Sequence, residues 1–213
     1  MIKYERDPKL IQKASIKSIR EKLALDDPDN YEHQILARMI YAYGDDNVFP
    51  DARISSDAIA SGLLALKKNA NILCDSKMVM EGLKHQYLNK EPICLIDRPN
   101  VISQAKAKKI TRAMVSVDNW KRYASGSIVL IGNEATALLH LMELLEQDEI
   151  DKPALIIGMP RGYLNTVESK QYLWDNHQRL GIPCMTVCGT KGGSALTAAA
   201  MNGLIYLKQG VFL

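Results

Sequence analysis

The spacing of apolar residues along the chain changes near residue 70. Up to that point apolar residues recur every three or four positions, which is the period of a helix with one buried face. The pattern predicts helices at residues 8–23, about 28–43 and about 57–68, and a loop at 45–50. Proline and polar capping residues mark the helix starts, and Gly44 ends the second helix. The starts are Asp7-Pro8, Asp26-Asp27-Pro28 and Ser56-Asp57.

Beyond residue 70 the chain alternates short apolar runs with longer helical patterns. The apolar runs predict strands at residues 71–74, 92–96, 127–131, 154–158 and 184–188. Helices are expected at 78–83, 101–123, 134–147, 167–180 and 193–207. This alternation is typical of an α/β fold in which helices cover both faces of a doubly wound, mostly parallel sheet, here of five strands. No linker interrupts the chain, so we expect residues 1–213 to form a single domain. The extra N-terminal helices would cover the sheet or form a dimer contact.

Three of the predicted strands end in glycine and lead directly into a helix. The three turns lie at residues 132–136, 158–170 and 189–194. The carboxyl ends of parallel strands share one edge of a sheet, and the first N–H groups of a helix bind anions. Tight geometry alone explains one such turn, but three at one edge indicate a composite ligand site. The turns contain neither the G-x-G-x-x-G nor the G-K-[ST] sequence of known phosphate-binding loops.

Composition and charge exclude several classes of protein. The net charge is +3 over 213 residues and no basic run stands out, which argues against nucleic-acid binding. The apolar runs are too short for a membrane span, and the first residues lack the apolar core of a signal peptide. No two histidines have metal-ligand spacing, so no metal site is expected. The cysteines lack C-x-x-C spacing, which predicts buried free thiols in a reducing cytoplasm; they are Cys74, Cys94, Cys184 and Cys188.

Seven short motifs follow one another along nearly the whole chain. They are Tyr4-x-Arg6-Asp7 with Ser15; Ala37-Arg38-Met39-Ile40; Asp75-x-x-Met78-Val79-x-x-Gly82; Gly132-Asn133-x-x-Thr136; Gly158-Met159-Pro160-x-Gly162; Glu168-Ser169-Lys170; and Gly192-Gly193-Ser194-Ala195. In this order and spacing they resemble the precorrin-8X methylmutase family of corrin-ring biosynthesis.

The resemblance implies an isomerase without a dissociable cofactor. In this family a methyl group moves between adjacent ring carbons of precorrin-8X or cobalt-precorrin-8, which gives hydrogenobyrinate or cobyrinate. The resemblance also implies a flavodoxin-like α/β/α fold and a cytoplasmic homodimer that binds the macrocycle near the subunit interface. Because the substrate carries many carboxylates, helix N-termini and the cations Arg161, Lys170 and Lys191 are expected to receive them. Apolar side chains such as Met78 and Val79 are expected against the ring faces.

The resemblance also assigns site residues one by one. The catalytic position falls on Tyr41, where the family places a histidine thought to protonate the ring and so promote the methyl shift. A phenol titrates near pH 10 and an imidazole near pH 6.5, so proton donation from tyrosine is weaker by roughly 5 kcal/mol before its surroundings act. The assigned substrate-binding residues are Ser15, Arg38, Asp75, Met78, Val79, Gly132, Asn133, Thr136, Gly158, Pro160, Arg161, Gly162, Glu168, Ser169, Lys170, Lys191, Gly193 and Ser194.

Departures from the family pattern leave other functions open. Thr190 stands in place of an arginine, and Arg161 and Tyr163 in place of valine and phenylalanine, which adds polarity and extends the candidate ligands to other corrinoids and tetrapyrroles. The exchange at Tyr41 is also expected in a related protein that binds a corrinoid without isomerising it. A nucleotide-binding protein of flavodoxin type is a third alternative, against which the absent fingerprints argue.

Overall fold

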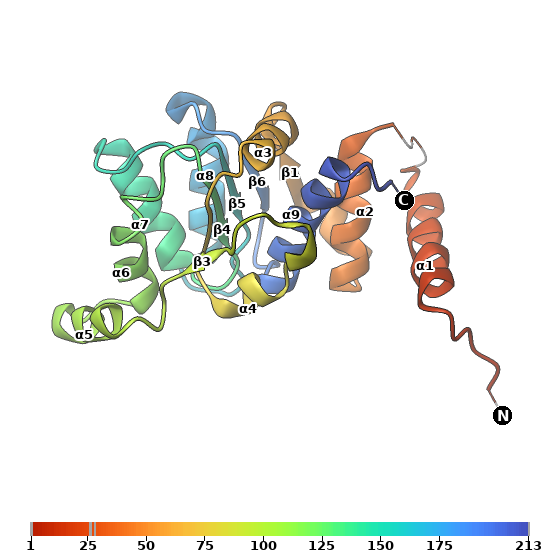
Figure 1. Ribbon diagram of the computed structural model, residues 1–213, viewed down its shortest axis with the longest axis horizontal. Coiled ribbons are helices and arrows are strands. Elements are labelled where there is room, and N and C mark those ends of the chain that lie inside the picture. Colours follow the sequence, from red (N-terminus) through yellow and green to blue (C-terminus); the bar gives the residue numbers. More distant parts are fainter. Residues whose placement is uncertain (1, 26, 28, 213) are drawn as a thin grey trace.

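The computed structural model describes residues 2–25, 27 and 29–212. In this part of the chain a six-stranded sheet lies between layers of helices (Figure 1). The strands are β1 (Ala52–Ile54), β2 (Ile72–Cys74), β3 (Ile93–Cys94), β4 (Ile128–Ile131), β5 (Leu155–Gly158) and β6 (Cys184–Val187). The helices are α1 (Pro8–Leu23), α2 (Tyr31–Tyr43), α3 (Ala58–Lys67), α4 (Lys77–Glu81), α5 (Pro99–Lys108), α6 (Arg112–Asp118), α7 (Ala135–Glu146), α8 (Thr166–Leu180) and α9 (Ser194–Lys208), with short 3-10 helices η1 (Asp46–Asp51) and η2 (His85–Tyr87).

The sheet is mixed and mostly parallel, with the strand order β1-β6-β5-β4-β2-β3. The strands from β2 to β6 run parallel, and the direction of winding reverses between β2 and β4. The prediction of five strands is wrong by one, because β1 pairs antiparallel with β6, Ala52 lying opposite Val187. This edge strand is only three residues long and follows Pro50, so it has too few positions to show a strand period.

The parallel strands are buried on both faces, which explains their unbroken apolar sequences. In β4, Ile128 and Leu130 pack in a core with α2, α3 and α9. Val129 and Ile131 point to the opposite face, into a core with α5 to α8. Two helical layers therefore share one sheet, as the alternation of strands and helices predicts.

The N-terminal helices lie beyond α9, not directly on the sheet. Figure 1 shows α2 alongside α9 and α1 on the outer side of α2, near both ends of the chain. Asp7 caps α1 as predicted, since its carboxylate accepts from the N–H groups of Lys9 and Leu10. Asn30 caps α2 through the N–H groups of Glu32 and His33. The predicted caps Asp26 and Pro28 lie outside the described residues.

Two other predictions about local structure are wrong. The helix expected at 101–123 is two helices, because Lys109 adopts a left-handed conformation (φ 55°) that ends α5, and the Thr111 hydroxyl then caps α6. The loop expected at 45–50 contains η1, whose start Asp45 caps through the N–H of Asn47. No helix in the described residues is long and apolar enough to cross a bilayer.

Candidate active site at the carboxyl edge of the sheet

The carboxyl ends of β4, β5 and β6 lie side by side, because β5 pairs in parallel with both neighbours. Just beyond the strands, the N–H of Met159 donates to the carbonyl of Ile131 (2.8 Å). The hydroxyl of Thr186 donates to the carbonyl of Gly158 (2.6 Å). The prediction that the three glycine turns share one edge of the sheet is therefore confirmed.

Asp75, at the end of β2, holds the turn between β4 and α7. We call residues 132–134 the Asp75 turn. The carboxylate accepts from the N–H of Asn133 (2.7 Å) and the N–H of Glu134 (3.0 Å), and the side chain is only 1% exposed. Burial raises the pKa of Asp75, and these backbone hydrogen bonds oppose that rise. Two N–H groups that the sequence offered to a ligand anion are thus bound to the protein's own carboxylate.

Gly132 brings the Asp75 turn against the start of α9. A Cβ at this position would lie 2.8 Å from the Thr197 hydroxyl, 2.9 Å from Ser194 Cα and 2.9 Å from Val79 Cγ2. Real Cβ atoms do not approach other atoms so closely, so glycine is required for this contact. The first and third glycine turns consequently touch, and Val79 lies in the core between them instead of at the surface.

A second turn, between β6 and α9, is tied to the loop that follows β5. We call residues 189–193 the Lys170 turn. Its Gly193 donates an N–H to the carbonyl of Met159 (2.7 Å), and its Thr190 carbonyl accepts from the N–H of Gly162 (3.2 Å). Gly192 has φ 152°, and a Cβ there would lie 2.3 Å from the Met159 carbonyl oxygen. The backbones of the two segments are in direct contact.

The Glu168-Ser169-Lys170 segment points mostly inward from the first turn of α8. The Ser169 hydroxyl donates to the carbonyl of Thr166 (3.0 Å), and Lys170 Nζ donates to the carbonyl of Lys191 (2.5 Å). Both side chains are buried, while Glu168 is exposed. Burial lowers the pKa of Lys170 to about 8. In the structure these two residues have backbone partners, and their contact with substrate stays a prediction.

Around these buried residues, both a cationic side chain and apolar side chains are exposed. Arg161 is exposed, and its Cδ lies 3.3 Å from the position of a Cβ on Gly193, so the guanidinium stem crosses the Lys170 turn. Apolar side chains also reach solvent at this edge: Met78 is 71% exposed and Tyr163 91% exposed, followed by the exposed Leu164. An exposed arginine beside exposed apolar side chains suits a ligand that is both anionic and apolar.

Three of the predicted residues lie on the N-terminal helices. Tyr41, on α2, is 41% exposed. Arg38, one turn earlier, is buried with its guanidinium carbon 3.9 Å from the ring centroid of Tyr206, and it donates to the carbonyl of Val211 (3.5 Å). Burial lowers the pKa of Arg38 to about 10. The Ser15 hydroxyl donates to the carbonyl of Ile11 in its own helix (2.7 Å).

Burial divides the predicted residues into two sets. The buried ones are Arg38, Asp75, Val79, Gly132, Gly158, Pro160, Ser169, Lys170, Gly193 and Ser194. The exposed or half-buried ones are Ser15, Tyr41, Met78, Asn133, Thr136, Arg161, Gly162, Glu168 and Lys191. The buried set, apart from Arg38 on α2, builds the edge, and the second set has surface that a ligand can reach.

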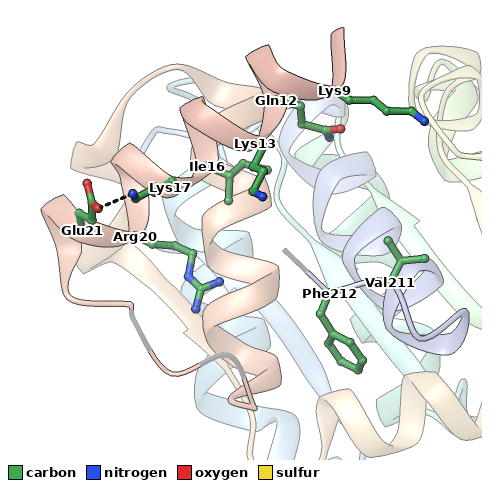
Figure 2. A pocket seen from close by; sticks show the side chains of 9 residues that line it. All are labelled: Lys9, Gln12, Lys13, Ile16, Lys17, Arg20, Glu21, Val211 and Phe212. Atoms are coloured by element: carbon green, nitrogen blue, oxygen red, sulfur yellow. Dashed lines mark ion pairs between the residues drawn. The ribbon is translucent and has the colours of Figure 1, made fainter. Parts of the chain in front are cut away.

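A groove of about 690 Å³ that sequence reasoning missed lies between α1 and the C-terminal residues (Figure 2). Apolar side chains and cations line it together: Lys9, Gln12, Lys13, Ile16, Lys17, Arg20, Glu21, Val211 and Phe212. The signal in the sequence is the spacing of three lysines by four residues, which places them on one side of α1. Val211 connects this groove to Arg38, whose guanidinium binds its carbonyl.

Of the four cysteines, Cys74 and Cys184 are buried as predicted, whereas Cys94 and Cys188 are only partly buried. All of them are free, and burial raises the pKa of Cys74 and that of Cys184, the latter to about 12. Within the described residues no group of three or more histidine, cysteine or acidic side chains could hold a metal ion.

Comparison with known proteins identifies the family. The profile described as precorrin-8X methylmutase matches residues 10–207. The chain belongs to the precorrin-8X methylmutase family. It is 38% identical over 206 residues to the precorrin-8X methylmutase of Pseudomonas aeruginosa, covering 96% of this chain and 98% of that one. It is also 35% identical over 185 residues to the cobalt-precorrin-8 methylmutase of Leptospira interrogans, covering 84% of each.

The fold agrees with this family. The structure of precorrin-8X methylmutase from Thermus thermophilus superposes with a TM-score of 0.83 at 32% sequence identity, over 95% of this chain and 98% of that one. A precorrin-8X methylmutase related protein superposes with a TM-score of 0.78 at 28% identity, over 91% of this chain. The methylmutase profile spans every residue assigned above to the site, from Ser15 to Ser194.

Proposed function

We propose that this protein is an isomerase of corrin biosynthesis that acts on precorrin-8X or cobalt-precorrin-8. A methyl group leaves one ring carbon and bonds to the adjacent one, so substrate and product have the same composition and no co-reactant is consumed. The observation that carries the proposal is the match to methylmutases over nearly the whole chain. The five parallel strands also have the order of flavodoxin-like sheets, to which we assign them.

Tyr41 is our candidate for the proton donor. Its side chain is partly exposed and lies one turn beyond the buried Arg38, on a helix fixed by packing against α9. A phenol hydroxyl donates a hydrogen bond or a proton, so it can act on a ring atom during the shift. Tyr41→Phe is expected to lower kcat about 10- to 1,000-fold with little change in KM, because general acid catalysis contributes to the chemical step.

The accessible groups at the sheet edge are proposed to bind the macrocycle. Arg161 would contact a substrate carboxylate, and Met78 would lie against a ring face. The ammonium of Lys191 is bound to Asn47 and Asp51, so its contact with substrate requires release from these partners. Exposed Tyr163 and Leu164 leave this side of the site open to solvent in a single chain. We infer that a second copy covers them, which gives a homodimer with the macrocycle near the interface. Four free thiols support a reducing, cytoplasmic location.

The test is incubation with precorrin-8X and, separately, with cobalt-precorrin-8, followed by visible spectroscopy and mass spectrometry. The expected product has an unchanged mass and a new chromophore, formed at catalytic protein concentration. Recovery of unchanged substrate from both reactions would contradict the proposal. The preferred substrate also tells whether the natural ring is metal-free.

A second candidate function is corrinoid binding without isomerisation. The tyrosine at position 41 is the observation that favours it, because a phenol is a much weaker acid than an imidazolium. Tyr41→His separates the two. A parent protein that already turns over excludes the binder, whereas a silent parent with an active Tyr41→His variant supports it.

A further inference from the structure

Lys170 is a buried cation at the carboxyl edge of the sheet. Its side chain has no exposed surface, and its ammonium donates to the carbonyl of Lys191 in the Lys170 turn. The electrostatic partners that favour its charged form are Cys188 and the Asp51 carboxylate. Burying an ammonium group is unfavourable unless partners stabilise it, so its place in the fold depends on that carbonyl.

The turn that Lys170 binds is held from several other sides. Gly193 and Thr190 tie it to the loop after β5 through the hydrogen bonds described above. Lys191 Nζ donates to the carbonyl of Asn47 (2.6 Å) and pairs with Asp51 (3.2 Å), which ties the turn to η1. Lys170 adds a tie from α8. The backbone of Lys191 is therefore fixed at its carbonyl and its side chain at its ammonium.

Two groups next to the turn would meet the proposed substrate: the start of α9 and the side chain of Arg161. The turn leads into α9, and the stem of Arg161 crosses it at Gly193. We propose that Lys170 is a positioning residue, whose ammonium holds the Lys170 turn so that Arg161 and the start of α9 meet the carboxylates of the substrate. Lys170 itself does not touch the substrate. This inference rests on the proposed function, since it concerns how the same site binds its substrate.

Lys170→Met tests the role, because methionine fills similar space without a donor. The amides of Gly193 and Gly162 are expected to exchange with solvent at least tenfold faster in the variant. With precorrin-8X, kcat/KM is expected to fall about 10- to 100-fold, mainly through a higher KM, because the misplaced groups bind carboxylates. The control is Gln171→Met, the next residue on α8, whose exposed amide donates to Asp175. It should keep the parent values.

The pH profile gives a readout that a merely structural lysine would not move. Because the pKa of Lys170 is about 8, its ammonium loses a proton as the pH rises through that value. Deprotonation favours the closed turn over an opened one, because opening returns Lys170 to water, where its pKa is 10.5. Exchange of the Gly193 and Gly162 amides in the parent, corrected for intrinsic exchange, is therefore expected to slow as the pH rises through 8, and Lys170→Met should lack this slowing. Cys188→Ala should retain it, which excludes the facing thiol as its origin, and Asp51→Asn should move it to lower pH by removing a facing negative charge.

Three results would overturn the inference: unchanged exchange of Gly193 and Gly162 in Lys170→Met, an unchanged KM, or the same pH dependence of exchange in Lys170→Met as in the parent. If Lys170→Met does not fold, the same two amides are followed in the parent across pH 8, corrected for intrinsic exchange. Their protection must rise as Lys170 deprotonates, because the lowered pKa of the buried lysine favours the closed turn at higher pH. If the parent isomerises neither substrate, the proposed function fails first, and the exchange rates still decide whether Lys170 holds the turn.

Discussion

The Asp75 turn and the Lys170 turn each lead from a strand into a helix and each contact a buried charge, which is negative in the first and positive in the second. In the first, a buried carboxylate accepts from two consecutive backbone N–H groups. In the second, a buried ammonium donates to one carbonyl, and close backbone contact between Gly192 and Met159 adds a steric constraint. The comparison teaches that similar strand-to-helix turns can depend on different atoms. Each turn combines a buried charge with a glycine that has no room for a side chain: Asp75 with Gly132 in the first, and Lys170 with Gly192 in the second.

The largest effect is expected at the glycine of the Lys170 turn. Gly192→Ala would place a Cβ 2.3 Å from a backbone oxygen at φ 152°, so backbone must move. We expect the free energy of unfolding to fall by about 3–4 kcal/mol, from steric overlap and a strained backbone together. Urea denaturation of the parent and the variant measures this difference in the free energy of unfolding.

Gly189→Ala is the matched control for that substitution. It also has positive φ, at 77°, but nothing lies within 4 Å of its Cβ position. Its cost should be only about 1–2 kcal/mol, from the left-handed conformation alone. Equal losses at the two glycines would show that close contact is not what holds the Lys170 turn.

The next effect is expected at the charge of the Asp75 turn. Asp75→Ala leaves the N–H groups of Asn133 and Glu134 without their acceptor, which should lower the free energy of unfolding by about 2–3 kcal/mol. Asp75→Asn keeps an acceptor oxygen of the same shape and should lose about 1 kcal/mol or less. Thermal unfolding of the pair distinguishes them. An alanine variant as stable as the asparagine variant would mean that water replaces the carboxylate.

The two charges should also give opposite dependences of stability on pH. The pKa of Asp75 is raised by burial, so the unfolded state binds fewer protons and stability decreases as the pH rises from about 3.8 to the raised pKa. The pKa of Lys170 is lowered from 10.5 to about 8, so the unfolded state binds more protons and stability increases with pH across that interval.

For Lys170 the dependence should amount to about 1–2 kcal/mol after allowance for relaxation of the buried site, and for Asp75 the prediction is the sign of the dependence. Urea midpoints of the parent are compared with those of Asp75→Asn between pH 4 and 7 and with those of Lys170→Met between pH 7 and 10. The difference from the parent should change with pH in each case. A constant difference would contradict the assigned cause.

The smallest effect on stability is expected at Arg161, whose exposed side chain lies across the Lys170 turn at Gly193. Arg161→Ala should change the free energy of unfolding by less than about 0.5 kcal/mol. It should raise the KM for precorrin-8X about 5- to 10-fold by removing a carboxylate contact. Arg161→Lys is the charge-matched control and should recover part of the loss. A normal KM in the alanine variant would remove Arg161 from the proposed site.

The sequence predicts the architecture well because the apolar runs of β4 to β6 are buried on both faces and the glycines at their ends are required by geometry. It does not predict β1, a short edge strand, or the break at Lys109, where a left-handed residue gives no composition signal. It also places Asp75 and Lys170 at the site without revealing that they face inward. Burial and partner choice depend on contacts between distant segments, such as Lys170 with Lys191, that local patterns do not encode.

The pairing of β1 with β6 has a consequence for how the chain is made. Ala52 lies opposite Val187, 135 residues later in the sequence, and α2 packs on α9, which follows β6. A ribosome synthesises the chain from the N-terminus at about 5–20 residues per second, so the first helices wait several seconds for their partners. During that interval the apolar side of α2 has no native partner, and a nascent chain stalled before residue 184 should bind chaperones that the completed protein does not need.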